Sequence, residues 1–226
     1  MVTRTLQFHS NKSPSTAPKV AIVVWYSVCI VTGALLTLLS GKQEDPSGSI
    51  DRQVTLLACA VIFVARASWT LFGFVKRRIP WWEAAWGGGS IGLVLFFLLR
   101  TGLRTPQPLG IVDLPGILLY ITGSYLGSAS EYSRHLWKAR PENLEHLYTE
   151  GLFTYCRHIN YFGDLLLFAG LGILTRQAWT AIVPFVMAVN FIFFIIPAHD
   201  AYLATRYGNE FVEYARRARK LFPFIY

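Results

Sequence analysis

The feature that most limits how this chain can fold is a succession of long apolar runs. Residues 20–39 hold no charged side chain and are about long enough to cross the hydrocarbon core of a bilayer as a helix. Comparable runs cover residues 54–75, 81–99 and 109–128. Inside a bilayer, a helix satisfies all of its own backbone hydrogen-bonding groups, so runs of this length favour helices. The pattern predicts an all-α, polytopic integral membrane protein.

Two shorter apolar runs follow in the carboxyl-terminal part of the chain. They are residues 165–174 and 178–196, and only Thr175-Arg176-Gln177 separates them. This spacing predicts a tight helical hairpin and brings the total to about six transmembrane helices. No internal repeat is visible, so we expect one membrane domain. Its parts are a loose amino-terminal tail, a substrate-side group of four spans and a cofactor-binding catalytic half, at residues 1–19, 20–128 and 129–226.

The charge distribution indicates what surrounds the chain. A formal charge of +8 could suggest nucleic acid, but Lys and Arg cluster at the ends of the apolar runs, as at Lys76-Arg77-Arg78. The loop at residues 41–53 is slightly negative, so the positive-inside rule places both termini in the cytosol. Arg100 and Arg104 on the opposite side weaken this bias. We expect membrane lipids and no nucleic acid as partners, and an interfacial or water-facing basic tail at residues 199–226.

The cysteines and histidines give no sign of a disulfide framework or a metal site. Cys29, Cys59 and Cys156 lack paired spacing and fall in or beside predicted spans, and the five histidines are scattered. No metal is expected. The apolar run that follows the polar first 19 residues is too long for a signal-peptide core, so no cleaved signal is expected.

One stretch places polar groups where they are costly. Residues 151–164 read Gly-Leu-Phe-Thr-Tyr-Cys-Arg-His-Ile-Asn-Tyr-Phe-Gly-Asp and lead into an apolar run. If a helix begins near His158, residues spaced by three and four share one face. These are Arg157, Asn160, Tyr161 and Asp164. Ionisable groups at such depth usually mark a site or a pathway, although anchoring of a helix at the headgroups is the structural alternative.

Two further polar sets flank this stretch. The long polar segment at residues 130–160 is expected to be either a helical extension or a functional loop. Arg134 and Lys138 are four residues apart there, so one helical face would present two cations to an anionic group. A solvated helix at headgroup level is the alternative. The other set lies near the end of the chain and comprises His199, Asp200, Arg206, Tyr207 and Tyr214.

These motifs carry a resemblance to a known superfamily. The 151–164 stretch, the upstream Glu131-x-x-Arg134-x-x-x-Lys138 and the ending from Arg206-Tyr207-Gly208 to Pro223-Phe224-Ile225-Tyr226 resemble the carboxyl-terminal half of the sterol reductases and steroid 5-alpha-reductases. The resemblance covers about residues 131–226. Isoprenylcysteine carboxyl methyltransferases and related phospholipid methyltransferases share this architecture.

Two departures bear on the choice between these branches. Ile159 stands where both branches have a proline. His199-Asp200 stands where the methyltransferases usually carry a Glu-Glu pair associated with the methyl donor, which argues against methyl transfer. The motif at residues 160–164 is closer to the sterol reductases, whereas the spacing from Tyr214 to Pro223 suits the methyltransferases at least as well.

The resemblance implies an NADPH-dependent reductase of a carbon–carbon double bond in a sterol, steroid or other isoprenoid-type substrate, in the endoplasmic reticulum membrane. Its cofactor would enter a cytosolic-side pocket formed by the last spans and the tail. The implied phosphate-binding cations are Arg134, Lys138 and Arg157. The other implied cofactor-binding residues are His158, Asn160, Asp164, Asp200 and Arg206. The implied catalytic residues are Asp164 and the proton donor, Tyr161 or Tyr207.

Alternatives remain open at this point. NADPH is a polyanion that favours Arg and Lys, whereas S-adenosylmethionine carries a sulfonium cation that favours carboxylates and aromatic faces. Both kinds of side chain lie in the same region, so a methyltransferase is the second hypothesis and a non-catalytic membrane scaffold the third. The substrate would enter among the first four spans. The unusual polar residues there, each with a possible structural role, are Arg66, Glu83 and Asp113.

Overall fold

The computed structural model describes residues 15–40 and 49–226, and its elements are helical throughout these ranges. In the first half lie α2 (Thr16–Ser40), α3 (Ile50–Trp69), α4 (Trp81–Glu83) and α5 (Gly89–Leu103). In the second half lie α6 (Leu114–Lys138), α7 (Ile159–Leu174), α8 (Ile182–Asn190), α9 (Ile196–Tyr207) and α10 (Asn209–Arg217). Short π turns continue α3 through Thr70–Phe74, join α4 to α5 and join α8 to α9.

Five helical stretches are long and apolar enough to cross a membrane. They are Thr16–Leu39, Ile50–Phe74, Trp81–Leu103, Ile111–Lys138 and Ala178–Tyr207. The polytopic all-α prediction is therefore confirmed. The expected fifth span is the shorter α7, which forms the predicted hairpin with α8 through a turn at residues 175–181.

Helix boundaries differ from the predicted spans at several places. The last spanning stretch continues through α9 to Tyr207, eleven residues past its predicted end at 196, so the predicted water-facing tail is wrong for residues 199–207. α2 begins at Thr16 and not near residue 20, and the buried Lys19 in its first turn donates a hydrogen bond to the Val75 carbonyl. The rest of the predicted loose tail, residues 1–14, lies outside the described residues, as do residues 41–48 of the first loop. α6 continues ten residues beyond the predicted end at 128, so the first part of the 130–160 segment is the helical extension.

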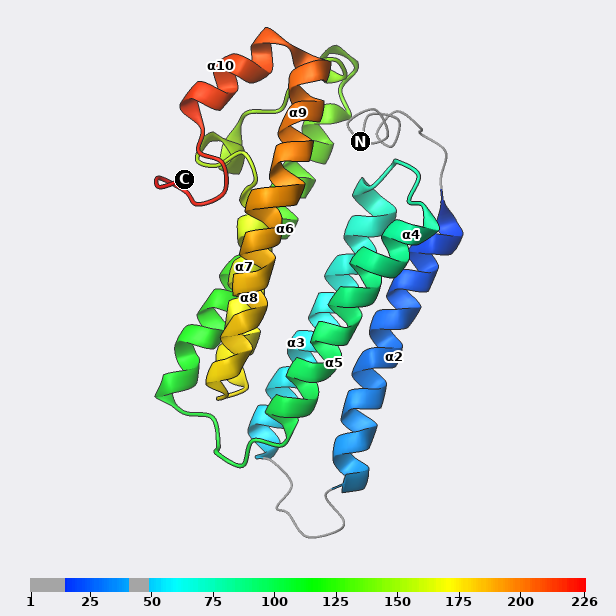
Figure 1. The fold of residues 1–226 in the computed structure, drawn as a ribbon, viewed down its shortest axis with the longest axis vertical. Helices are drawn as coiled ribbons and strands as arrows, with labels where there is room; N and C mark the ends of the chain where they lie inside the picture. Colours follow the sequence, from blue (N-terminus) through cyan, green and yellow to red (C-terminus); the bar gives the residue numbers. More distant parts are fainter. Residues whose placement is uncertain (1–14, 41–48) are drawn as a thin grey trace.

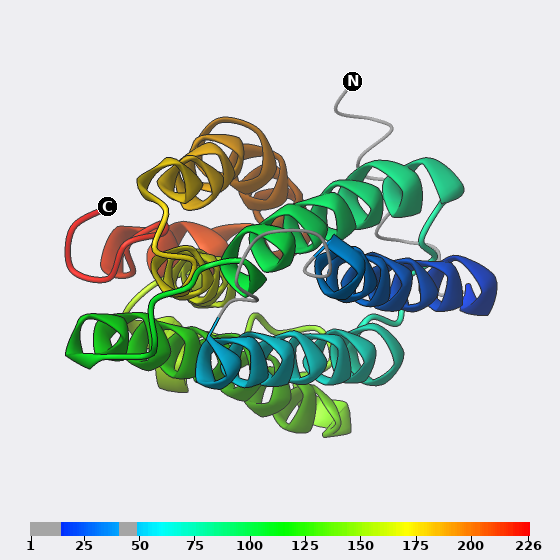
Figure 2. The same ribbon diagram turned by 90° about the horizontal axis from the view of Figure 1, so that it is seen from below.

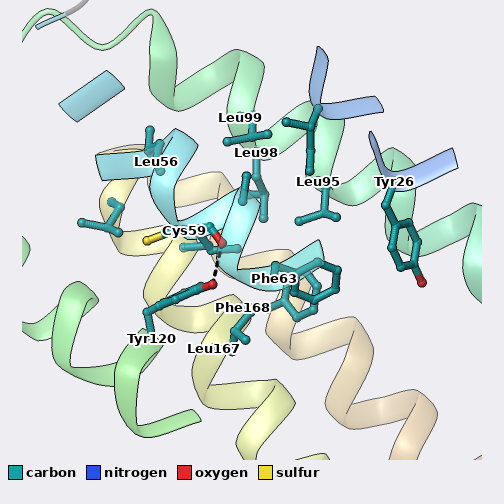
Figure 3. Close-up of a cluster of buried hydrophobic side chains, with 14 of the residues drawn as sticks. Tyr26, Leu56, Cys59, Phe63, Leu95, Leu98, Leu99, Tyr120, Leu167 and Phe168 are labelled. Carbon is teal, nitrogen blue, oxygen red and sulfur yellow. Dashed lines mark hydrogen bonds between the residues drawn. The ribbon is translucent and has the colours of Figure 1, made fainter. Parts of the chain in front are cut away.

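The helices form two groups that lie side by side. Figure 1 shows α2, α3 and α5 in one group and α6, α7, α8 and α9 in the other, and Figure 2 shows the same helices from below. The core between the groups is apolar: Phe63 of α3 meets Phe168 of α7 edge to face at 5.7 Å (Figure 3). The Tyr120 hydroxyl donates to the Cys59 carbonyl at 2.6 Å, which satisfies both polar atoms.

Glycines bring α6 and α7 together. A Cβ at Gly123 of α6 would lie 2.3 Å from the Gly163 carbonyl oxygen, and one at Gly163 would lie 2.7 Å from the Gly123 oxygen. Gly116 of α6 and Gly170 of α7 make the same kind of contact seven residues away along each helix. A Cβ at Gly170 would lie 2.5 Å from the Gly116 oxygen. The close helix contact expected at Gly123 and Gly127 therefore exists, and α7 is the partner.

A buried ion cluster closes the end of the bundle opposite α10. Arg52, with no exposed surface, and Arg176 both bind the carboxylate of Asp113 at 2.7–3.1 Å. Arg52 also donates to the carbonyls of Gln107, Pro108 and Leu174. Asp113 accordingly has a structural role: it ties α6 to the start of α3 and to the α7–α8 turn.

Candidate active site

The polar residues of the 151–164 stretch do not all lie on one helix. α7 begins at Ile159, so Asn160 and Asp164 share a helical face, while Arg157 precedes the helix. A parallel bridge pairs Cys156 with Arg219, and the Arg157 and His158 amides donate to the Arg219 and Lys220 carbonyls. The predicted single face is therefore wrong for Arg157, because hydrogen bonds to the tail hold its backbone in a turn that precedes α7.

The first cluster of the site lies between α3, α6 and α7. Asp164 binds Arg66 of α3 at 2.7 Å. Glu131 of α6, which is buried, accepts a hydrogen bond from Asn160 at 3.0 Å and another from Arg134. We call these five residues the α7 cluster. Its two carboxylates and two guanidinium groups balance in charge.

The second cluster joins α9 to the tail. Asp200 binds Arg157 at 2.9 Å with one carboxylate oxygen, and its other oxygen lies 2.9 Å from His158 Nε2. Arg157 also donates to the carbonyls of Ala215 and Ala218 at 3.0 and 3.1 Å. The Arg157 side chain is only 6% exposed, and its Nε has no hydrogen-bond partner among the described residues. Three elements distant in sequence are therefore locked together here.

Tyr161 connects the two clusters. Its ring stacks on His158 with centroids 5.3 Å apart and on Phe191 with centroids 4.9 Å apart. It is also close enough to Glu131 and Asp164 to interact electrostatically with both carboxylates. The Tyr161 ring thus lies between the two carboxylates of the α7 cluster and His158 of the second cluster.

The remaining predicted site residues lie at the outer end of α6 and α9. Lys138 donates to the carbonyls of Asn143, Leu144 and His146, and it lies 3.3 Å from the Tyr207 hydroxyl. Arg206 is exposed and donates to the Tyr202 hydroxyl at 3.0 Å. Lys138 and Tyr207 lie close enough to Arg134 of the α7 cluster to interact electrostatically with it. The hydrogen bonds of the Lys138 ammonium, however, go to the loop after α6, which it stabilises.

The tail packs against the site through a second aromatic core. Tyr214 of α10 donates its hydroxyl to the Phe153 carbonyl at 2.7 Å, and burial raises the pKa of this phenol. The Cys156 thiol, with no exposed surface, donates to the Leu221 carbonyl at 2.9 Å, and burial raises its pKa to about 11. Both groups therefore remain protonated and hold the tail in place.

Some site residues were missed, or given another role, in the sequence analysis. Arg66 was named only as an unusual polar residue among the first four spans, with a possible structural role, and it is the ion-pair partner of Asp164. Tyr26 of α2 lies close enough to Asp164 to interact electrostatically, and nothing in its apolar surroundings indicated this. Glu83 forms an ion pair with Arg77, so it has the structural role that was one of its two expected roles. In the described part of the chain, no three His, Cys, Asp or Glu side chains come together as a metal site would require.

The part of the chain that matches a known protein family contains most residues of these two clusters. Residues 90–218 match the family described as "Protein of unknown function (DUF1295)", and they include all of α6, α7, α8, α9 and α10. The chain belongs to the DUF1295 family. This family membership covers Glu131, the α7 residues and Asp200, whereas Arg66 and Tyr26 come from the part of the chain before the match.

A curated protein supplies a second comparison for this DUF1295 member. The chain is 31% identical over 115 residues to "Protein-S-isoprenylcysteine O-methyltransferase B" of Arabidopsis thaliana. The alignment covers 49% of this chain and 58% of the relative, so the chain spans little more than half the length of the enzyme it matches. This likeness supports the methyltransferase hypothesis at least as well as the reductase hypothesis.

Proposed function

We propose that this protein is a membrane-embedded, S-adenosylmethionine-dependent methyltransferase that acts on a lipophilic substrate. The observation that carries this proposal is the charge balance of the site. The relative with a methyltransferase name supports it independently.

The cations expected to hold NADPH phosphates are already engaged. Arg157 is bound to Asp200 and two carbonyls, Lys138 to three carbonyls, and Arg134 to Glu131. A dinucleotide with a 2′-phosphate would need several of these groups released at once, and each release would leave a carboxylate or a carbonyl unpaired. This cost counts against NADPH.

A compact cofactor with a positive centre would approach Glu131 and Asp164, which are themselves paired with Arg134 and Arg66, and would need fewer of these contacts released than a dinucleotide. Glu131 and Asp164 supply carboxylates, and the face of Tyr161 supplies a π system beside them. When bound, S-adenosylmethionine would supply an electrophilic methyl group. We propose that Glu131 and Asp164 hold this cofactor, that Asn160 orients it, and that Asp200 acts indirectly by fixing Arg157 and His158.

The protein would then need only to bring the nucleophilic group of the substrate to this methyl group and to exclude water from the site. The acceptor we propose is a carboxylate or an amine carried on a lipid. It would enter laterally from the membrane among α2, α3 and α5, where the apolar core meets the Arg66–Asp164 pair. The protein is a multi-pass membrane protein by its helices, and residence in the endoplasmic reticulum with cytosolic termini is part of this proposal.

A reductase is the second candidate because of Tyr161. Its phenol lies beside Glu131 and Asp164 next to the core, where it could donate a proton to a substrate carbanion. In that case NADPH would supply a hydride, and Arg134 and Arg206, which are the more exposed cations, would meet its phosphates. The motif at residues 160–164 is the sequence feature that favours this candidate.

The two candidates separate in a ligand-binding measurement on the full-length protein. Thermal unfolding of detergent-purified protein is followed while S-adenosylmethionine and NADPH are titrated in parallel. A ligand at 100 times its dissociation constant stabilises the folded state by about 2.7 kcal/mol. We expect S-adenosylmethionine to raise the unfolding temperature and NADPH to leave it unchanged.

Variants identify the site in the same assay. Glu131→Gln keeps the shape of the side chain and removes its charge, so the shift with S-adenosylmethionine should be lost. Glu213→Gln is the matched control because Glu213 is exposed on α10. A shift with NADPH alone would overturn the methyltransferase proposal in favour of the reductase. The absence of a shift with either ligand would leave the non-catalytic scaffold.

A further inference from the structure

The last segment of the chain presents cations and apolar side chains on one surface. α10 buries Phe211 and Tyr214 against the bundle and leaves its other face exposed. The exposed basic residues of α10 and the segment after it are Arg216, Arg217, Arg219 and Lys220. None of the four forms an ion pair with a carboxylate in the described ranges, although other cations such as Arg157 and Arg176 do.

The backbone of this segment is held rigidly on the protein. Leu221 is fully buried, and its carbonyl accepts the Cys156 thiol. The amides of Arg157 and His158 hold the carbonyls of Arg219 and Lys220. The exposure of these cations is therefore set by the fold: the backbone faces inward and the two long side chains face outward.

A tight turn then projects two apolar side chains. Phe224 has a positive φ of 68°, which L residues rarely adopt, and Ile225 and Tyr226 donate back to the Phe222 carbonyl. Phe224 is 75% exposed and Ile225 is 81% exposed. The ring of Phe224 meets that of Tyr155 edge to face at 5.7 Å, so the apolar tip of the turn is fixed in position.

The location of the turn indicates what it contacts. Figure 1 shows the segment returning from α10 toward the helices, and Figure 2 shows it at the outer edge of the α6–α9 group. Apolar residues at the tip and cations behind it match the order of acyl chains and phosphates at a bilayer surface. Polybasic segments of this kind favour anionic lipids over zwitterionic ones.

We propose that residues 212–226 form a docking surface for the headgroups of anionic phospholipids. Phe224 and Ile225 enter the acyl boundary, and the four cations bind phosphates at headgroup level. This interaction surface is independent of the reaction that the protein catalyses. A solvent-exposed tail and a lipid contact without headgroup preference are the alternative outcomes of the test.

A reporter on the turn tests the proposal. Ile225→Cys introduces an exposed thiol, while the three native cysteines are buried. The full-length protein is labelled there with bimane and reconstituted in vesicles that contain either brominated phosphatidylglycerol or brominated phosphatidylcholine. We expect stronger quenching by the anionic lipid, equivalent to at least a threefold preference.

Charge variants complete the test. Arg216→Gln/Arg217→Gln/Arg219→Gln/Lys220→Gln should abolish the preference. The matched control, Lys76→Gln/Arg78→Gln/Arg104→Gln/Arg140→Gln, removes four exposed cations elsewhere and should retain it. No quenching, equal quenching by the two lipids, a preference that survives the tail substitutions, or equal loss in both variants would each overturn the proposal.

Discussion

Arg66 of α3 and Asp164 of α7 form an ion pair at 2.7 Å that joins the two helix groups beside the candidate active site. The two partners differ in environment: the Arg66 side chain is 14% exposed and its Nε has no hydrogen-bond partner among the described residues, whereas Asp164 is 33% exposed. Replacing Asp164 and replacing Arg66 should therefore lower the stability of the protein by different amounts.

Asp164→Asn should destabilise the protein more than Arg66→Met. The first change leaves a largely covered guanidinium without its counter-ion, at a cost of about 3 kcal/mol. The second leaves a carboxylate that water can reach, so its cost should be about half as large. Chemical unfolding in detergent measures both. The double variant should cost less than the sum of the two single changes, and additive costs would mean that the pair contributes no coupling.

Gly163→Ala should separate α6 from α7. Its Cβ would meet the Gly123 oxygen at 2.7 Å and the Gly127 nitrogen at 2.8 Å, and these backbone atoms cannot rotate away. We expect a loss of about 1–3 kcal/mol in unfolding free energy. Gly89→Ala is the control, because nothing lies within 4 Å of a Cβ there and alanine favours helices. Equal stability of the two variants would contradict the close packing described above.

Arg52→Gln should be more damaging than Arg176→Gln. Both arginines bind Asp113, but Arg52 is fully buried and also holds three carbonyls, whereas the Arg176 side chain is 27% exposed. Loss of Arg52 should cost about 3–5 kcal/mol, in the range for a broken buried pair. The expected order can be checked by thermal unfolding of the two variants in the same detergent. A larger effect at Arg176 would show that exposure does not set the ranking.

Cys156 should resist alkylation in the folded protein. Burial raises its thiol pKa to about 11, so at pH 8 only about one thiol in a thousand is ionised, compared with about one in ten at the ordinary value of 9.0. Maleimide labelling followed by mass spectrometry should modify the Ile225→Cys thiol within minutes and leave Cys156 unmodified. Labelling of Cys156 should rise with pH as its thiolate forms. Fast labelling of Cys156 at pH 8 would mean that the tail detaches from residues 156–158.

The helical architecture follows from sequence because hydrophobic length is a local property. A span such as residues 20–39 is recognisable without knowledge of its neighbours, and Gly123 with Gly127 indicates a close contact even though the partner is unknown. The role of Arg157 is different. Its spacing from Asn160 and Asp164 suggested one helical face, and only the pairing of Cys156 with Arg219 removes it from that helix.

The sequence by itself determined that the chain crosses a membrane and that its polar residues gather in the carboxyl-terminal half. Only the tertiary structure decided which charges neutralise one another. Ion pairs such as Arg66 with Asp164 and Arg157 with Asp200 join residues 98 and 43 positions apart, so no local pattern specifies them. Because a buried charge is tolerated only beside a partner, these long-range contacts determine which groups remain available for a cofactor.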